Sequence, residues 1–106
     1  MNVLIVDDHQ VVWTGMRLVM ERLAGQIDAG RKVEFVGARD VPDALRHRSE
    51  SFDLVLLDFH LPGVSGLDAL REIRDAFEST PVVVLSGEQS SKLIRATIDN
   101  GAAGFI

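Results

Sequence analysis

The sequence predicts a single α/β domain in which a doubly wound parallel sheet of five strands alternates with four helices. Short runs of valine, isoleucine and leucine recur along the chain without strict polar alternation, as in strands that are buried on both faces. Amphipathic segments with helical spacing separate these runs. With 106 residues, the chain is long enough for one compact domain and too short for two.

The composition of five short segments is the clearest signal in the sequence, and it predicts strands. In chain order they are residues 2–6, 32–37, 52–57 and 81–86, followed by a weaker candidate at 102–106. Each is short, apolar and rich in β-branched residues, which suits the interior of a parallel sheet.

The segments between the strands carry helix signals. The first helix, predicted over 9–25, has an apolar stripe of Val12, Gly15, Met16, Val19, Met20 and Leu23. Asp40 is placed to cap the second helix, and Ser65 with Asp68 nearly matches a capping box for the third. Asn100 and Gly101 are a C-terminal signal for the fourth.

Composition excludes several classes of protein. The net charge of -5, with Lys and Arg dispersed among acids, argues against direct binding of nucleic acid. The absence of cysteine excludes disulfides and thiolate metal sites. No apolar run approaches the roughly 20 residues that span a membrane, and the first residues do not resemble a signal peptide. We therefore expect a cytoplasmic protein without membrane contact.

Acidic side chains follow two predicted strands at the edge where ligands bind in such sheets. Asp7 and Asp8 end the first strand and Asp58 ends the third, while Ser86, Gly87 and Glu88 follow the fourth. Taken singly, each acid has a simpler explanation as a helix cap or a loop residue, and His9 and His60 are explained as exposed loop residues. Their joint placement at strand ends favours a functional site.

The chemistry of these residues favours Mg²⁺. Three carboxylates that lie close together need a positive charge to stay ionised. Mg²⁺ commonly takes one or two carboxylates, keeps several waters and pairs with phosphate oxygens. A carboxylate beside Mg²⁺ can act as the nucleophile toward a phosphoryl group and form an aspartyl phosphate.

These residues bring out a resemblance that covers essentially the whole chain. The segments "VLIVDDH", "FDLVLLDFHLPGVSGLDAL", "TPVVVLSG" and "IDNGAAGFI" resemble the receiver domain of two-component response regulators. The segments "DDH", "GMRLVME" and "GAAGFI" are most similar to receivers that precede a LuxR-type helix-turn-helix domain. The resemblance implies a flavodoxin-like, CheY-like fold with strand order 2-1-3-4-5 and one receiver domain over residues 1–106.

The resemblance also assigns roles by position. Asp58 would accept a phosphoryl group from a histidine kinase, and Mg²⁺ would be held by Asp7, Asp8, Asp58 and the backbone carbonyl of His60. Ser86 and Phe105 would form the conformational switch. Pro62, Gly87 and Glu88 would lie in loops near the site.

As a receiver, the chain would be a phosphoacceptor switch and not an enzyme, apart from a slow loss of its own phosphoryl group that His60 and Glu88 would tune. Its effector would control transcription. In the family, helix 1 and helix 5 often contribute to dimer or interdomain contacts, so a homodimer is one candidate assembly. The family has a lysine and a fifth helix after the last strand, so the resemblance predicts a chain truncated after Ile106, with that helix missing.

The residues leave two alternative functions open, and they also leave the placement of Trp13 open. One is a receiver-like module that binds partners without phosphorylation, which the absent lysine would permit. Another is a Mg²⁺-dependent phosphohydrolase with an Asp nucleophile, although such an enzyme would be expected to carry an acid where His60 stands. Trp13, off the main stripe of the first helix, either contributes to a dimer or interdomain contact or lies flat on its own helix.

Overall fold

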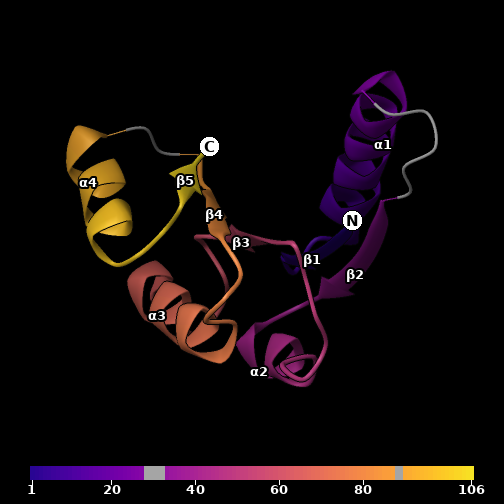
Figure 1. Ribbon diagram of the computed structural model, residues 1–106. Helices are drawn as coiled ribbons and strands as arrows, with labels where there is room; N and C mark the ends of the chain where they lie inside the picture. The colour runs from indigo at the N-terminus through magenta and orange to yellow at the C-terminus, as the bar shows by residue number, and fades with distance from the viewer. Residues whose placement is uncertain (28–32, 88–89) are drawn as a thin grey trace.

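The computed structural model describes residues 1–27, 33–87 and 90–106, in which five strands alternate with four helices (Figure 1). The elements are β1 (Asn2–Val6), α1 (Gln10–Ile27), β2 (Glu34–Ala38), α2 (Val41–Leu45), β3 (Leu54–Asp58), α3 (Gly66–Ala76), β4 (Val82–Leu85), α4 (Ser91–Asp99) and β5 (Gly104–Phe105). The alternation confirms the predicted fold class. Glu88, expected near the site, lies outside the described residues.

The strands form one parallel sheet in the order β2-β1-β3-β4-β5, as predicted. Val6 of β1 pairs with Leu57 of β3, and Asp58 pairs with Leu85 of β4. This register places the residues that follow β1, β3 and β4 at the same edge of the sheet. The fold therefore brings the predicted site residues from three separate segments to one place.

The core is divided by the sheet into two clusters of apolar side chains. The larger cluster lies between the sheet and helices α2 and α3, and includes Leu57, Leu70 and Ile73, all fully buried. The smaller cluster lies on the α1 side and includes Val3 and Ile5 (Figure 1). Helices thus lie on both faces, as a doubly wound sheet requires.

Strand β4 shows how unevenly the two faces are covered. Val82 and Val84 are buried, whereas Val83 and Leu85 on the α1 side are only half-buried. Ile106, just after β5, is 65% exposed. Within the described residues, four helices are present, and the α1 side of β4 is the less protected one.

Local signals in the sequence explain most helix ends. The Asp40 carboxylate accepts a hydrogen bond from the Asp43 N–H at 2.8 Å, and the Ser65 hydroxyl accepts one from the Asp68 N–H at 3.2 Å. Such N-caps satisfy N–H groups that have no partner inside the helix. After α4, Gly101 has a φ of 97°, the left-handed conformation in which glycine ends helices without steric cost.

The first helix differs from its prediction. It continues to Ile27, beyond the expected end at residue 25. Of the predicted stripe, Val12 and Met16 are half-buried but Val19 is 54% exposed, and the side chains of Met20 and Leu23 lie outside the described residues. Trp13 packs with Met16 on the smaller cluster instead, because α1 approaches the sheet through a neighbouring line of its surface.

No helix among the described residues combines the length and apolar character that crossing a membrane requires.

Candidate functional site

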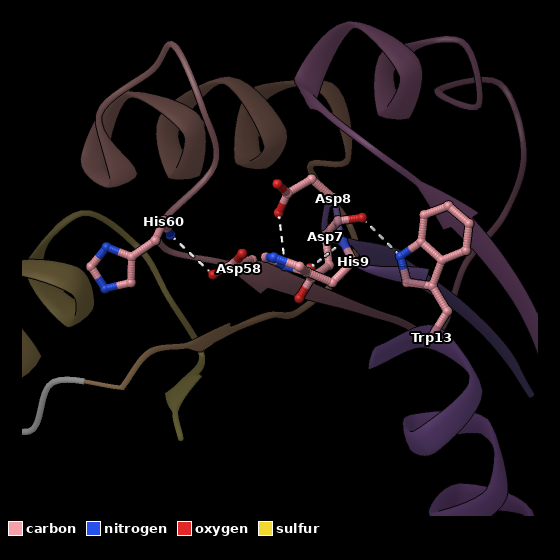
Figure 2. A network of polar contacts seen from close by, with 6 residues as sticks. All are labelled: Asp7, Asp8, His9, Trp13, Asp58 and His60. Carbon is pink, nitrogen blue, oxygen red and sulfur yellow. Dashed lines mark hydrogen bonds and ion pairs between the residues drawn. The ribbon is translucent and has the colours of Figure 1, made fainter. Parts of the chain in front are cut away.

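An acidic cluster lies where β1 and β3 end. One potential ligand atom from each of Asp7, Asp8, His9 and Asp58 lies within 4.8 Å of all the others. Figure 2 shows these four side chains side by side, with Asp58 reaching them from β3. The structure thus brings together the three carboxylates predicted from the sequence and adds the His9 imidazole.

Asp7 is the most firmly held member of the cluster and is only 4% exposed. Its Oδ1 accepts hydrogen bonds from the His9 N–H at 2.8 Å and contacts His9 Nδ1 at 3.1 Å. Its own N–H donates to the carbonyl of Ala38 at 2.9 Å. The indole N–H of Trp13 donates to the Asp7 carbonyl at 2.9 Å (Figure 2). Contacts from β2 and α1 therefore fix the backbone on which both acids stand.

The position of Trp13 corrects the interpretation that this residue lies flat on its own helix. Its ring lies against the backbone of Gly37 in β2, where a Cβ atom would come within 2.6 Å of two ring carbons. Only glycine allows this approach. Trp13 therefore does not lie flat on its own helix: it joins α1 to β2 and to the end of β1.

Asp8 shows the clearest sign of a missing counter-charge. Its Oδ1 is buried and accepts no hydrogen bond, although it lies 3.0 Å from His9 Nδ1 within the distance of an ion pair. This close approach lacks the alignment of a hydrogen bond and therefore contributes little. A buried carboxylate oxygen without a donor is costly, and a cation would satisfy it.

The negative charge of the cluster affects the pKa of His9. The hydrogen bond that His9 donates to the Asp7 carboxylate raises the pKa of His9 above its usual value of 6.5, and the negative charges of Asp8 and Asp58 raise it further. The carboxylates thus favour positive charge at this place. Oxygen ligands and excess negative charge are the properties with which proteins hold Mg²⁺, so the residues present fit this ion.

Asp58 is the last residue of β3 and is half-buried. Its Oδ1 accepts a hydrogen bond from the His60 N–H at 3.0 Å, and the Phe59 N–H donates to the carbonyl of Leu85 at 2.9 Å. Strand and loop together hold the carboxylate at the edge of the cluster. Such a rigidly mounted, partly accessible carboxylate suits a nucleophile.

Ser86 directly follows β4, and Phe105 lies in β5. The Ser86 hydroxyl is 3.3 Å from His60 Nε2, and the Ser86 N–H donates to the carbonyl of Ile106 at 2.9 Å. Phe105 in β5 pairs with Val84 and is half-buried against the larger core cluster. Both predicted switch residues thus lie on the side of the site away from β1.

Two of the three predicted loop residues, Pro62 and Gly87, lie within the described part of the chain. Pro62 is exposed, and Gly63 has a φ of 77°, which turns the chain after β3. Gly87, two residues after β4, is exposed. Two participants were missed from the sequence, His9 as part of the cluster and Trp13 as the support of Asp7. The "DDH" spacing signals the first, whereas nothing local signals the second.

A parallel 2-1-3-4-5 sheet with a carboxylate cluster at its carboxyl edge defines a doubly wound α/β domain whose ligand site lies at that edge. Residues 3–106 match the response regulator receiver domain family. The chain belongs to this family, whose members are signalling phosphoacceptors of two-component systems and are phosphorylated by histidine kinases. Receiver domains bind Mg²⁺ at an acidic pocket, and the corresponding aspartate cluster is present here.

Relatives of two kinds match nearly all of the chain. The sensory/regulatory protein RpfC of Xanthomonas campestris is 40% identical over 100% of this chain and 14% of its own length. The response regulator UvrY of Escherichia coli is 32% identical over 99% of this chain and 46% of its own length. The chain therefore spans less than half of these relatives.

Solved structures agree with the fold. A LuxR-family two-component response regulator from an Aurantimonas species superposes with a TM-score of 0.79 and 29% identity, covering 98% of this chain and 71% of its own. A Burkholderia pseudomallei response regulator with a phosphorylated aspartic acid and a calcium ion gives 0.77 and 26%, covering 98% and 57%. LuxR-family regulators are thus among the neighbours, as the resemblance predicted.

Proposed function

We propose that Asp58 is the phosphoryl acceptor of this receiver domain and that Asp7, Asp8, Asp58 and the His60 carbonyl hold a Mg²⁺ ion. The observation that carries the proposal is the convergence of three carboxylates within 4.8 Å, one of them with a buried oxygen that accepts no hydrogen bond. When bound, Mg²⁺ would supply positive charge that offsets the charge of the carboxylates and of the incoming phosphoryl group.

The residues of the chain supply position and accessibility. A carboxylate oxygen of Asp58 forms a bond to phosphorus, the phosphorus–nitrogen bond of the donor phosphohistidine breaks, and the donor imidazole keeps the electron pair and takes up a proton. The His60 N–H, at 3.0 Å from Oδ1, orients the Asp58 carboxylate. Phosphoryl transfer depends mainly on such positioning and on neutralisation of charge.

Ser86 and Phe105 are proposed to report the phosphorylated state. The new phosphoryl group offers strong acceptor oxygens that a nearby hydroxyl can hydrogen-bond. Ser86 stands beside β3 and its backbone is tied to Ile106, the residue after Phe105. A displacement of Ser86 would therefore be transmitted to β5, the kind of local charge event that biases a two-state element.

The effector is proposed to act in transcription. The transcriptional activator protein ExaE of Pseudomonas putida is 34% identical over all of this chain, which spans 47% of its length. Such a relative supports a transcriptional output for the proposed switch.

The acceptor role is tested by incubating the chain with Mg²⁺ and a small acyl phosphate and measuring its intact mass. We expect the mass of one phosphoryl group to be added, and expect no addition when Asp58→Ala is used or when a chelator replaces Mg²⁺. Equal labelling of Asp58→Ala would contradict the proposal. Repeated turnover of phosphomonoesters by the unmodified chain would favour a phosphohydrolase instead.

A further inference from the structure

His60 makes a side-chain contact across the site that the acceptor chemistry alone does not require. Its Nε2 lies 3.3 Å from the Ser86 hydroxyl, although the two residues are 26 positions apart in sequence. Figure 2 shows the imidazole pointing away from Asp58 and from the acids of β1. The ring therefore contacts the residue that follows β4, whereas the backbone of His60 faces Asp58.

Backbone hydrogen bonds fix both partners of this contact. The His60 N–H donates to Asp58 Oδ1 at 3.0 Å, and the N–H of Phe59 donates to the carbonyl of Leu85 at 2.9 Å. The Ser86 N–H donates to the carbonyl of Ile106 at 2.9 Å. With the loop after β3 and the end of β4 held in this way, the imidazole and the hydroxyl meet at little further entropic cost.

We propose that His60 is a positioning residue that holds the Ser86 hydroxyl in the unphosphorylated chain and competes with the phosphoryl group for it. A serine hydroxyl has a single proton to donate. In the proposed tautomer, His60 carries its hydrogen on Nδ1, so Nε2 accepts the proton of the Ser86 hydroxyl. While Ser86 donates to Nε2, its hydroxyl cannot donate to a phosphoryl oxygen. This proposal rests on the proposed function, in which Ser86 responds to the phosphoryl group on Asp58.

The size of the effect follows from the kind of bond that is exchanged. Neutral partners at an exposed site form a hydrogen bond whose loss changes an equilibrium by about two- to tenfold. Removing the imidazole should therefore favour the state in which Ser86 faces the phosphoryl group by about that factor. The substitution should raise, and not lower, the affinity for a phosphoryl mimic.

The experiment is a calorimetric titration of the chain with beryllium trifluoride in the presence of Mg²⁺. We expect His60→Ala and His60→Phe to bind this mimic about two- to tenfold more tightly than the unchanged chain, because both lack ring nitrogens. The matched control is His47→Ala, whose imidazole pairs with Glu50 and packs against Phe52 after α2, and whose affinity should not change. In a Ser86→Ala background, His60→Ala should have no further effect.

Nitrogen NMR measures the tautomer of His60 directly. A residue with only a structural role would not require one particular tautomer. The spectrum should show Nε2 of His60 as an acceptor and Nδ1 as the protonated nitrogen. Unchanged or weaker binding by both His60 variants, an effect that persists in Ser86→Ala, or the opposite tautomer would each overturn the positioning role. These results are distinguishable from failure of the proposed function, because in that case the unchanged chain itself would not bind the mimic.

Discussion

Replacing Gly37 with alanine would place a methyl group against the ring of Trp13. An added Cβ would lie 2.6 Å from two ring carbons of Trp13 and 3.0 Å from a third. Carbon atoms in favourable contact are separated by about 3.5–4.0 Å, so the ring would have to move back by roughly an ångström. Such a movement also stretches the hydrogen bond from the indole to the Asp7 carbonyl, which is 2.9 Å long.

The expected cost can be worked out from these contacts. Overpacking of this kind costs about 1–3 kcal/mol, the weakened hydrogen bond about 1 kcal/mol, and the loss of glycine entropy returns about 0.5–1 kcal/mol. We therefore expect Gly37→Ala to lower the free energy of unfolding by about 2 kcal/mol. For a chain of this size, this corresponds to a decrease of roughly 10 °C in Tm.

Urea denaturation followed by circular dichroism measures this change, with Gly15→Ala as the matched control. Gly15 is exposed in α1 and an added Cβ there would meet no atom within 4 Å, so alanine should stabilise the chain by about 0.5–1 kcal/mol. In a Trp13→Ala background the cost of Gly37→Ala should largely disappear. A Gly37→Ala chain as stable as the unchanged one would refute the role assigned to Trp13.

Three further predictions concern a helix cap, a histidine and a metal ligand. Asp40→Ala should cost about 1 kcal/mol in urea denaturation, because the Asp43 N–H loses its acceptor. Without metal, an NMR titration should place the pKa of His9 above 6.5 mainly because of its hydrogen bond to Asp7, and Asp8→Asn should lower it. Since this pKa is raised in the folded chain, protonation of His9 stabilises the fold below the unfolded pKa, and the contribution is lost as pH rises through the folded pKa. Asp8→Asn should also weaken Mg²⁺ binding by roughly tenfold or more, measured by the fluorescence of Trp13, since a charged ligand becomes neutral.

Much of the fold could be predicted from local signals. The apolar runs marked all five strands, and Asp40, Ser65 and Gly101 marked helix ends, because these signals act within a few residues of the chain. The end of α1 was the exception. Residue 25 is a glycine, which favours a helix end but also fits inside a helix at a cost of about 1 kcal/mol, and the helix continues past it.

For the site, too, part of the arrangement could be predicted from the sequence and part could not. Asp7, Asp8 and Asp58 could be placed together because carboxyl ends of parallel strands share an edge. The contact of Trp13 with Gly37 could not, since it depends on the side from which α1 approaches β2. A pairing across 26 residues, as between His60 and Ser86, likewise depends on the register between strands, which no local pattern specifies.

We infer that the phosphoryl group resides on Asp58, although His9, His60 and Ser86 lie close to this carboxylate. Tandem mass spectrometry of peptides from the phosphorylated chain, after the acyl phosphate has been reduced with borohydride, tests this claim most directly. We expect the reduced residue at position 58, and we expect hydroxylamine to remove the phosphoryl group from the untreated chain. A phosphoryl group that resists hydroxylamine and maps to a serine, or one that maps to a histidine, would contradict it.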